Sequence, residues 1–185
     1  MDVFDSLLPV VREAESVKVL IGCELSGVVR RAFEERGFDA WSCDLEQSED
    51  ESNRHLVGDV RDVIHEDDWD FLAVFHPPCT RLCNSGVRWL SKPPAGKTVE
   101  QMQEELVEGA SLFSDLWNAT HIPCRAVENP VMHKYAKALI DNFRPPAQTV
   151  QPHFFGDKAF KATSLWLENL PLLVKQGALK TPKVG

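Results

Sequence analysis

The chain has 185 residues, of which 43% are hydrophobic, and a formal net charge of −8. This length and composition are typical of one globular domain and exclude an intrinsically disordered chain. No apolar run approaches the roughly 18 residues of a membrane span, and no basic stretch precedes the first apolar residues. We therefore expect a cytoplasmic protein that contacts no membrane, in the host cytoplasm if the source is viral.

The five cysteines are an odd number, and the pair Cys79 and Cys83 has no second Cys or His pair at zinc spacing. We expect reduced thiols and no metal site. The acidic balance makes the chain as a whole a poor partner for a phosphate backbone. Residues 80–99 nevertheless hold four cations and no acid. They form either a solvated loop or a surface that meets a phosphate-bearing substrate.

Apolar runs alternate with amphipathic segments along the chain. Strands are expected, in chain order, within residues 16–27 (with the turn that follows), 38–45, 55–60, 70–75, 124–130 and 163–169. Helices are expected over residues 28–37, 98–120 and 132–143, with Thr98 as the N-cap of the second. This alternation predicts an α/β, Rossmann-like fold, with a mostly parallel sheet and helices on both faces. No repeat or linker divides the chain, so one domain is expected.

Polar or conformationally special residues fall at five of the expected strand ends. In a mostly parallel sheet, ligands bind at the carboxyl ends of the strands. The residues concerned are Gly27, Asp44, Asp59, Cys79 and Glu128. Their shared position predicts one binding edge.

The first half of this edge has the pattern of an adenosine site: strand, turn of small residues, helix, and an acid closing the next strand. Gly27 would allow close approach of the backbone, and Asp44 would accept hydrogen bonds from ribose hydroxyls. Asp59 is placed to receive an exocyclic amine, or else merely caps a helix. Glu24 inside the turn would repel a pyrophosphate, which favours a neutral adenosine or a cationic sulfonium over a dinucleotide.

The second half of the edge combines a thiol with an acid. Pro77 and Pro78 stiffen the backbone before Cys79, and a helix start or the nearby Arg81 would favour the thiolate. Glu128 ends an apolar strand, where a carboxyl group is costly to bury without a function. A thiolate that adds to C6 of a pyrimidine and an acid that binds N3 would make C5 nucleophilic enough to accept a methyl group.

These motifs together resemble the cytosine-C5 DNA methyltransferase family, in particular a compact phage-type branch that lacks the target-recognition domain. The resemblance covers roughly residues 17–170 and rests on "PPC" (77–79), "ENP" (128–130) and the segment "FFGDKAFKATSLWL" (154–167). The Gly-rich first motif is altered, since Glu24 and Ser26 stand where the family has glycines, and Pro130 replaces a valine. The last segment has lost the family's arginines.

The resemblance implies an S-adenosylmethionine-dependent methyltransferase with one catalytic domain over 1–185: a helical extension (1–16), a core (17–170), a tail (171–185) and no target-recognition domain. It gives Cys79 the role of nucleophile, Glu128 the N3 contact and Asn129 an orienting role. Together with the strand-end reasoning, it predicts cofactor contacts from Gly22, Cys23, Glu24, Ser26, Gly27, Asp44, Leu45, Asp59, Val60 and Pro77. Substrate contacts are predicted from Arg81, Asn84, Ser85, Arg88, Trp89 and Lys161, with Lys161 standing in for a substrate-facing arginine.

The acceptor stays open at this point. Cytosine in DNA, double-stranded with a protein partner or a homo-oligomer, or single-stranded, comes first, and a free cytosine nucleotide is a close alternative because the chain is small and acidic. A catalytically idle adenosine-binding regulator or decoy is a different reading that the altered glycine motif favours. An amino-methyltransferase is a third, although His76 and Cys79 suit its Asp-Pro-Pro-Tyr motif poorly. Segment 2–16 is hypothesised to complete the cofactor pocket.

Overall fold

A computed structural model describes residues 17–75, 77–156 and 158–175, so the predicted extension 1–16 lies outside the described residues. The strands are β1 (Lys18–Gly22), β2 (Asp39–Asp44), β3 (His55–Val57), β4 (Phe71–Val74), β5 (Cys124–Pro130), β6 (Gln148–Val150) and β7 (Thr163–Glu168). The α-helices are α1 (Val28–Glu34), α2 (Val60–Val63), α3 (Val99–Trp117) and α4 (Lys134–Leu139), and two 3₁₀ turns are η4 (Val87–Leu90) and η5 (Pro152–Phe155).

The strands form one mixed sheet in the order β3-β2-β1-β4-β5-β7-β6. β1 pairs in parallel with β2 and β4, and β5 continues the parallel run beside β4. β7 is antiparallel to both of its neighbours, β5 and β6. The predicted α/β class is therefore confirmed, whereas the short strand β6 was missed because three residues carry too little pattern.

Helices cover both faces of the sheet, as predicted. One core cluster lies between the sheet and helices α2, α3 and α4 and includes Leu72, Phe113 and Trp166. The other lies on the opposite face, where Phe33 of α1 packs with Val19 and Phe71. Successive strand residues supply the two cores alternately, because side chains along a strand project to opposite faces.

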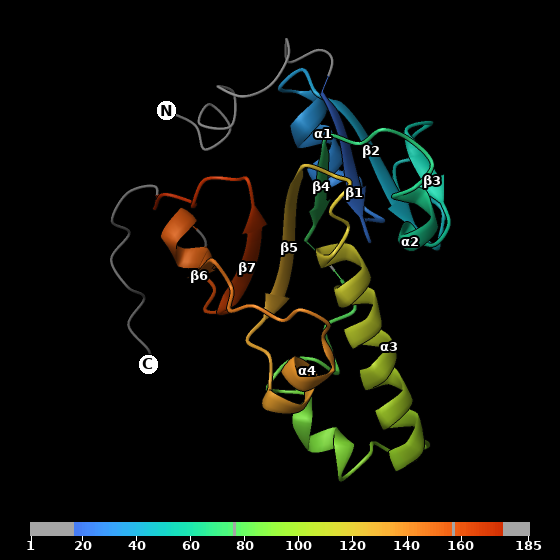
Figure 1. The fold of residues 1–185 in the computed structure, drawn as a ribbon, viewed down its shortest axis with the longest axis vertical. Coiled ribbons are helices and arrows are strands. Elements are labelled where there is room, and N and C mark those ends of the chain that lie inside the picture. Colours follow the sequence, from blue (N-terminus) through green and yellow to red (C-terminus); the bar gives the residue numbers. More distant parts are fainter. Residues whose placement is uncertain (1–16, 76, 157, 176–185) are drawn as a thin grey trace.

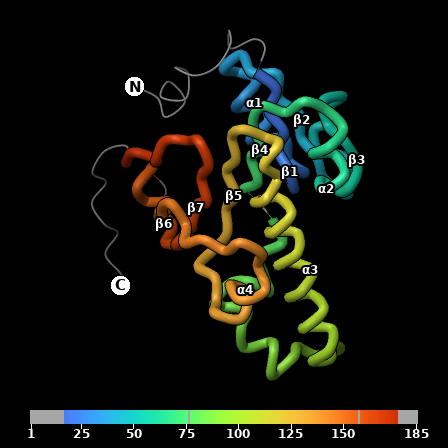
Figure 2. Tube along the Cα trace, viewed as in Figure 1, coloured from blue at the N-terminus to red at the C-terminus, as the bar shows by residue number. Residues whose placement is uncertain are grey.

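Several loops and helices extend past the carboxyl edge of the parallel strands. In Figure 1, α4 and the lower part of α3 extend beyond this edge, together with the green loop that follows β4. The tube in Figure 2 shows this loop beside the segment that follows β5. A bridge between Cys83 and Met132 and a hydrogen bond from Asn84 N to Val131 O join the two segments.

Several predicted boundaries differ from the observed ones. The third predicted strand, 55–60, stops at Val57, because Asp59 caps a short helix there. The predicted helix 132–143 is reduced to α4, with His133 as its cap. The strongest helical pattern, from Thr98 onward, is confirmed, and Thr98 and Gln101 form a reciprocal capping box. No helix in the described part of the chain combines the length and the apolarity needed to cross a bilayer.

Replacing Thr98 with alanine is expected to lower the free energy of unfolding by about 1 kcal/mol, because the N–H of Gln101 loses its acceptor. Urea unfolding of both forms measures the difference. Thr98→Ser keeps the hydroxyl and serves as the control. Equal losses in the two variants would show that the threonine methyl group, and not the cap, stabilises α3.

Candidate active site

The turn that carries Cys79 begins a few residues after β4 ends at Val74. The Cys79 carbonyl accepts hydrogen bonds from the N–H groups of Leu82 and Cys83, at 3.0 and 3.1 Å, so the chain forms a helical turn as soon as Pro78 ends. Pro77 is buried, whereas Pro78 is exposed on the turn. The two prolines and this turn hold the thiol in a fixed position at the carboxyl edge.

His133 fixes the same turn from the other side. Its Nε2 lies 2.7 Å from the Arg81 carbonyl, and its Nδ1 accepts a hydrogen bond from Ala136 N. A neutral imidazole with its proton on Nε2 satisfies both contacts. Its backbone N–H donates to the Leu82 carbonyl. The sequence analysis did not identify His133, because its two partners lie on a distant loop and within α4.

Two groups from other segments, Glu128 and Lys161, act on the Cys79 thiol through their charges. Glu128 lies near the end of β5, and Lys161 lies two residues before β7 begins. Because β7 runs antiparallel, its first residue pairs with Pro130 at the end of β5. The charges of Glu128 and Lys161 both act on Cys79, and that of Lys161 also acts on Glu128. The three predicted residues are therefore brought together.

The Glu128 carboxyl group is buried where its charge is disfavoured. The residue is 8% exposed, and its Oε1 has no hydrogen-bond partner among the described residues. Burial raises the pKa of Glu128 to about 7, and the positive charge of Lys161 opposes this rise only in part. At neutral pH the group is thus divided between a proton donor and a carboxylate, as a general acid requires.

The surroundings of Cys79 favour the neutral thiol. Burial raises the pKa of the Cys79 thiol, the charges of Cys83 and Glu128 add to the rise, and Lys161 lowers it. The expectation that Arg81 would stabilise the thiolate is wrong. The Arg81 Nε lies 2.6 Å from a Glu105 carboxylate oxygen on α3, and Arg81 is not among the charges that act on the thiol. Lys161 is the cation that acts on Cys79 instead.

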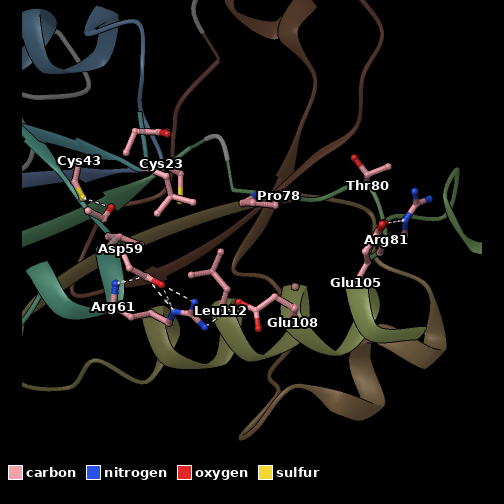
Figure 3. Close-up of a pocket in the computed structure, with 15 residues that line it drawn as sticks. Cys23, Cys43, Asp59, Arg61, Pro78, Thr80, Arg81, Glu105, Glu108 and Leu112 are labelled. Carbon is pink, nitrogen blue, oxygen red and sulfur yellow. Dashed lines mark hydrogen bonds and ion pairs between the residues drawn. The ribbon is translucent and has the colours of Figure 1, made fainter. Parts of the chain in front are cut away.

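A cavity of about 490 Å³ lies on the α3 side of the edge (Figure 3). Five of the predicted cofactor residues line it: Cys23, Asp44, Leu45, Asp59 and Val60. Pro78 and Thr80, the neighbours of Cys79, form another part of its wall. Cys79, Glu128 and Lys161 themselves do not line this cavity.

The sequence analysis missed one whole wall of this cavity. Residues Glu105, Glu108, Gly109 and Leu112 follow one face of α3 at helical spacing and line the cavity, as do Cys43, Gly58, Arg61 and Arg81. The signal that could have found the α3 wall is its two carboxylates on a face that otherwise carries glycine and leucine.

The glycine turn after β1 contributes less to the cavity than predicted. Gly22, Glu24, Ser26, Gly27 and Pro77 do not line it. Glu24 is 1% exposed, and its carboxylate accepts hydrogen bonds from the backbone N–H groups of Val29 and Arg30 at 2.6 and 3.0 Å. The assignment of the Glu24 side chain to the cofactor is therefore corrected: this carboxylate caps α1.

Gly27 and Gly22 are explained by local packing. Gly27 adopts a left-handed conformation, with a φ of 66°, at the start of α1, and a Cβ there would meet the ion pairs that Asp50 makes with Arg30 and Arg31. A Cβ on Gly22 would lie 2.7 Å from a methyl group of Val60. The Ser26 hydroxyl accepts a hydrogen bond from the N–H of Val28, so this side chain stabilises the turn before α1.

The two predicted adenosine acids differ in their availability. Asp59 caps α2 through the N–H of Arg61, and its carboxylate also pairs with the Arg61 side chain. The hydrogen bond from the Arg61 side chain lowers the pKa of Asp59. The capping role considered for Asp59 is thus present, although the residue also lines the cavity. Asp44 forms no ion pair with any residue that the structure describes, and its Oδ1 accepts only from the N–H of Glu46.

The other thiols at the cavity are poor nucleophiles. Burial, together with the charges of Asp44 and Asp59, raises the pKa of Cys23 to about 12. Burial likewise raises the pKa of Cys43 to about 12. Cys23 also has a left-handed backbone, with a φ of 56°. Among the described residues, no group of three or more His, Cys, Asp or Glu side chains is arranged to hold a metal ion.

The remaining predicted substrate residues lie on the loop beyond Cys79. Asn84 and Ser85 are exposed, and the Ser85 hydroxyl lies 3.0 Å from the Cys83 sulfur. The exposed guanidinium of Arg88 stacks 4.4 Å above the Trp89 ring. Their contacts with a substrate stay predictions.

Asn129 does not share a face of β5 with Glu128, since successive strand residues point to opposite faces. Its Nδ2 donates to the Pro130 carbonyl at 2.7 Å, and its Oδ1 is buried without a partner among the described residues. The orienting role of Asn129 stays a prediction.

Comparison of the chain with protein-family models and with curated protein sequences finds no match. Among solved structures, it is similar to WbdD in a co-crystal structure with a kinase inhibitor, with a TM-score of 0.43 and 12% sequence identity. The match covers 86% of this chain and 37% of that one, so the chain spans a little over a third of WbdD. A likeness of this degree carries no argument about function.

Replacing Gly86 with alanine is expected to disrupt the Cys79 turn, because a Cβ there would lie 1.8 Å from the Thr80 carbonyl oxygen. Backbone atoms on both sides cannot yield cheaply, so we expect the free energy of unfolding to fall by about 1–3 kcal/mol. Urea unfolding measures it. Gly58→Ala is the matched control, since its Cβ would meet Val63 at 3.9 Å. An unchanged Gly86→Ala stability would show that the turn has room to move.

Replacing Glu128 with glutamine is expected to stabilise the fold at high pH. The folded-state pKa of about 7 exceeds the ordinary value of 4.5, so the folded chain holds this proton more tightly than the unfolded chain. The stability that the proton gives is fully present below pH 4.5 and is lost as the pH rises through 7. At pH 8 the variant should gain up to about 3 kcal/mol.

Urea unfolding of the wild type and Glu128→Gln at pH 5 and pH 8 measures this gain. Glu104→Gln, an exposed change on α3, is the control and should alter neither value. A wild-type stability whose pH dependence Glu128→Gln leaves unchanged would mean that Glu128 titrates normally.

Proposed function

We propose that this chain is an S-adenosylmethionine-dependent methyltransferase that acts on carbon 5 of cytosine. The observation that carries the proposal is the meeting of Cys79, Glu128 and Lys161 at one edge of the sheet, on a turn whose flanking residues Pro78 and Thr80 line a ligand-sized cavity. A thiol, a carboxyl group that titrates near neutrality and a cation are the groups that addition to a pyrimidine requires.

The fold supports a nucleoside-type cofactor. The first five strands follow the order 3-2-1-4-5 of doubly wound nucleotide-binding sheets. In that arrangement the ligand lies outside the carboxyl ends at the point where the strand order reverses, between β1 and β4. The cavity lies at this place, since Cys23 follows β1 and Pro78 follows β4.

The cavity residues fit the predicted cofactor. Its volume of about 490 Å³ is in the range of small-molecule sites. Asp44 would accept hydrogen bonds from ribose hydroxyls, and Asp59 would accept one from the adenine amine after releasing Arg61. When bound, S-adenosylmethionine supplies an electrophilic methyl group on a sulfonium centre. The carboxylates of Asp44 and Asp59 tolerate that positive charge better than they would a pyrophosphate.

The residues of this chain then divide the chemistry. The Cys79 thiol loses its proton, and its sulfur adds to C6 of cytosine, forming the S–C6 bond. Glu128 in its protonated form donates a hydrogen bond to N3 and stabilises the charge that develops on the ring. Carbon 5 becomes the nucleophile and would take the methyl group, whose bond to the sulfonium sulfur breaks to leave a neutral thioether. Transfer of the C5 proton to water and departure of the Cys79 thiolate restore the C5–C6 double bond.

Glu128 can also serve as the acceptor of the Cys79 proton. With Glu128 as a carboxylate, the Cys79 thiol can pass its proton to that carboxylate, and this single transfer produces both the nucleophile and the acid. The pair then carries one negative charge, which Lys161 balances. Lys161 thus has a role beyond the substrate contact predicted for it.

The exposed charges of the loop 80–99 help to choose between the candidate methyl acceptors. Of its four cations, Arg81 and Lys97 both pair with Glu105, which leaves Arg88 and Lys92 for a phosphate-bearing substrate. Trp89 is available to stack on a base. Two cations on an acidic chain give a weak grip on duplex DNA, so we propose cytosine in single-stranded DNA, or in duplex DNA held by a partner or a second copy. The same observation favours a free cytosine nucleotide as the second candidate.

Oligonucleotides and nucleotides that contain 5-fluorocytosine test the proposal. The fluorine takes the place of the C5 proton and cannot leave as that proton does, so the wild type with S-adenosylmethionine should form a stable adduct at Cys79, detected by intact-protein and peptide mass spectrometry. Cys79→Ser should form none while it still binds the cofactor in calorimetry.

Cys83→Ser is the matched control and should keep the adduct, because Cys83 is turned toward Ser85 and the Thr80 carbonyl. The substrate that reacts identifies the acceptor. If the chain binds the cofactor but forms no adduct with any substrate, the methyltransferase proposal is wrong and an adenosine-binding regulator is favoured.

A further inference from the structure

The cavity beside Cys79 has two chemically different ends (Figure 3). One end has the carboxylates of Asp44 and Asp59. The other end is formed by Thr80, Arg81 and Glu105, with Pro78 between the two. A ligand that spans this cavity needs hydrogen-bond donors at the first end and a group that suits Thr80, Arg81 and Glu105 at the second.

The second end carries an excess of positive charge. Arg81 and Lys97 share one carboxylate, that of Glu105, so the three groups together have a net charge of +1. The Arg81 side chain is only 12% exposed, and its Nη1 has no hydrogen-bond partner among the described residues. A guanidinium whose Nε is paired and whose Nη1 is unpaired retains a donor for an anion.

The usual place for an anion in such a sheet is already taken. Backbone N–H groups at the start of the helix after the first strand commonly receive a ligand's negative group. Here the Glu24 carboxylate occupies the N–H groups of Val29 and Arg30, and it is buried. A negative group on the ligand would be repelled from that turn.

We infer that Arg81 binds the α-carboxylate of the methionine portion of the cofactor. The inference rests on the proposed function. With the ribose at Asp44 and the sulfonium near Pro78, the methionine portion extends toward Thr80 and Arg81. Its α-ammonium group then faces the α3 carboxylate of Glu105, which lines the same end. Arg81 thereby changes from a predicted substrate residue to a cofactor residue.

Calorimetry with two related ligands tests this assignment on the full chain. S-adenosylhomocysteine carries the amino acid carboxylate, whereas 5′-methylthioadenosine has the same adenosine and thioether without it. Arg81→Gln should weaken S-adenosylhomocysteine by about tenfold or more, the loss of one charge-assisted contact. It should leave methylthioadenosine within about twofold. Lys137→Gln removes an exposed cation of α4 that does not line the cavity, and should change neither affinity.

Equal weakening of both ligands by Arg81→Gln, or weakening of neither, would overturn the inference. If Arg81→Gln does not fold, Arg81→Lys serves instead: it can keep the ion pair with Glu105 but lacks the Nη1 donor, so it should also weaken S-adenosylhomocysteine selectively, and an equal effect on both ligands would be contrary to the inference. A wild-type chain that binds neither ligand would overturn the proposed function and the inference with it. A chain that binds both equally well would overturn the inference alone.

Discussion

The burial of one carboxyl group, that of Glu128, is the constraint on which the candidate site depends. A charge at that position lacks both water and a full set of hydrogen bonds, so the proton is retained to a pH near 7. The fold accepts a loss of stability at neutral pH to keep an acid there. Such a cost is common at functional sites, where environments shift the pKa of an acid toward the working pH.

The direction of β7 gives this carboxyl group its neighbours. If β7 ran parallel to β5, its start and Lys161 would lie at the opposite edge of the sheet. The antiparallel pairing places Thr163 beside Pro130, and Lys161 then acts on both Glu128 and Cys79. The Cys79 turn arrives from β4, and His133 holds it through the Arg81 carbonyl. Three separate connections thus converge on Cys79 and Glu128.

Charges that look available in the sequence are in part committed within the fold. Glu24 is bound to the first turn of α1, Asp59 to Arg61, and both Arg81 and Lys97 to Glu105. The loop after Cys79 therefore presents a smaller positive field than its composition indicates. The two ends of the cavity differ in charge: the carboxylates of Asp44 and Asp59 lie at one end, and the partly paired guanidinium of Arg81 lies at the other. A polarity of this kind orients a ligand as well as binding it.

The sequence by itself determined the α/β class, the capped helix α3 and the strand-end positions of Asp44, Cys79 and Glu128. These follow from local periods and from residues such as Thr98 and the paired prolines, which act on their immediate neighbours in the chain. Tertiary structure alone decided the antiparallel β7, the short strand β6, the α3 wall of the cavity and the partners of Arg81 and His133. Those features depend on contacts between segments far apart in the chain, such as Arg81 with Glu105 and Pro130 with Thr163, and no local pattern encodes which distant group will neutralise a given charge.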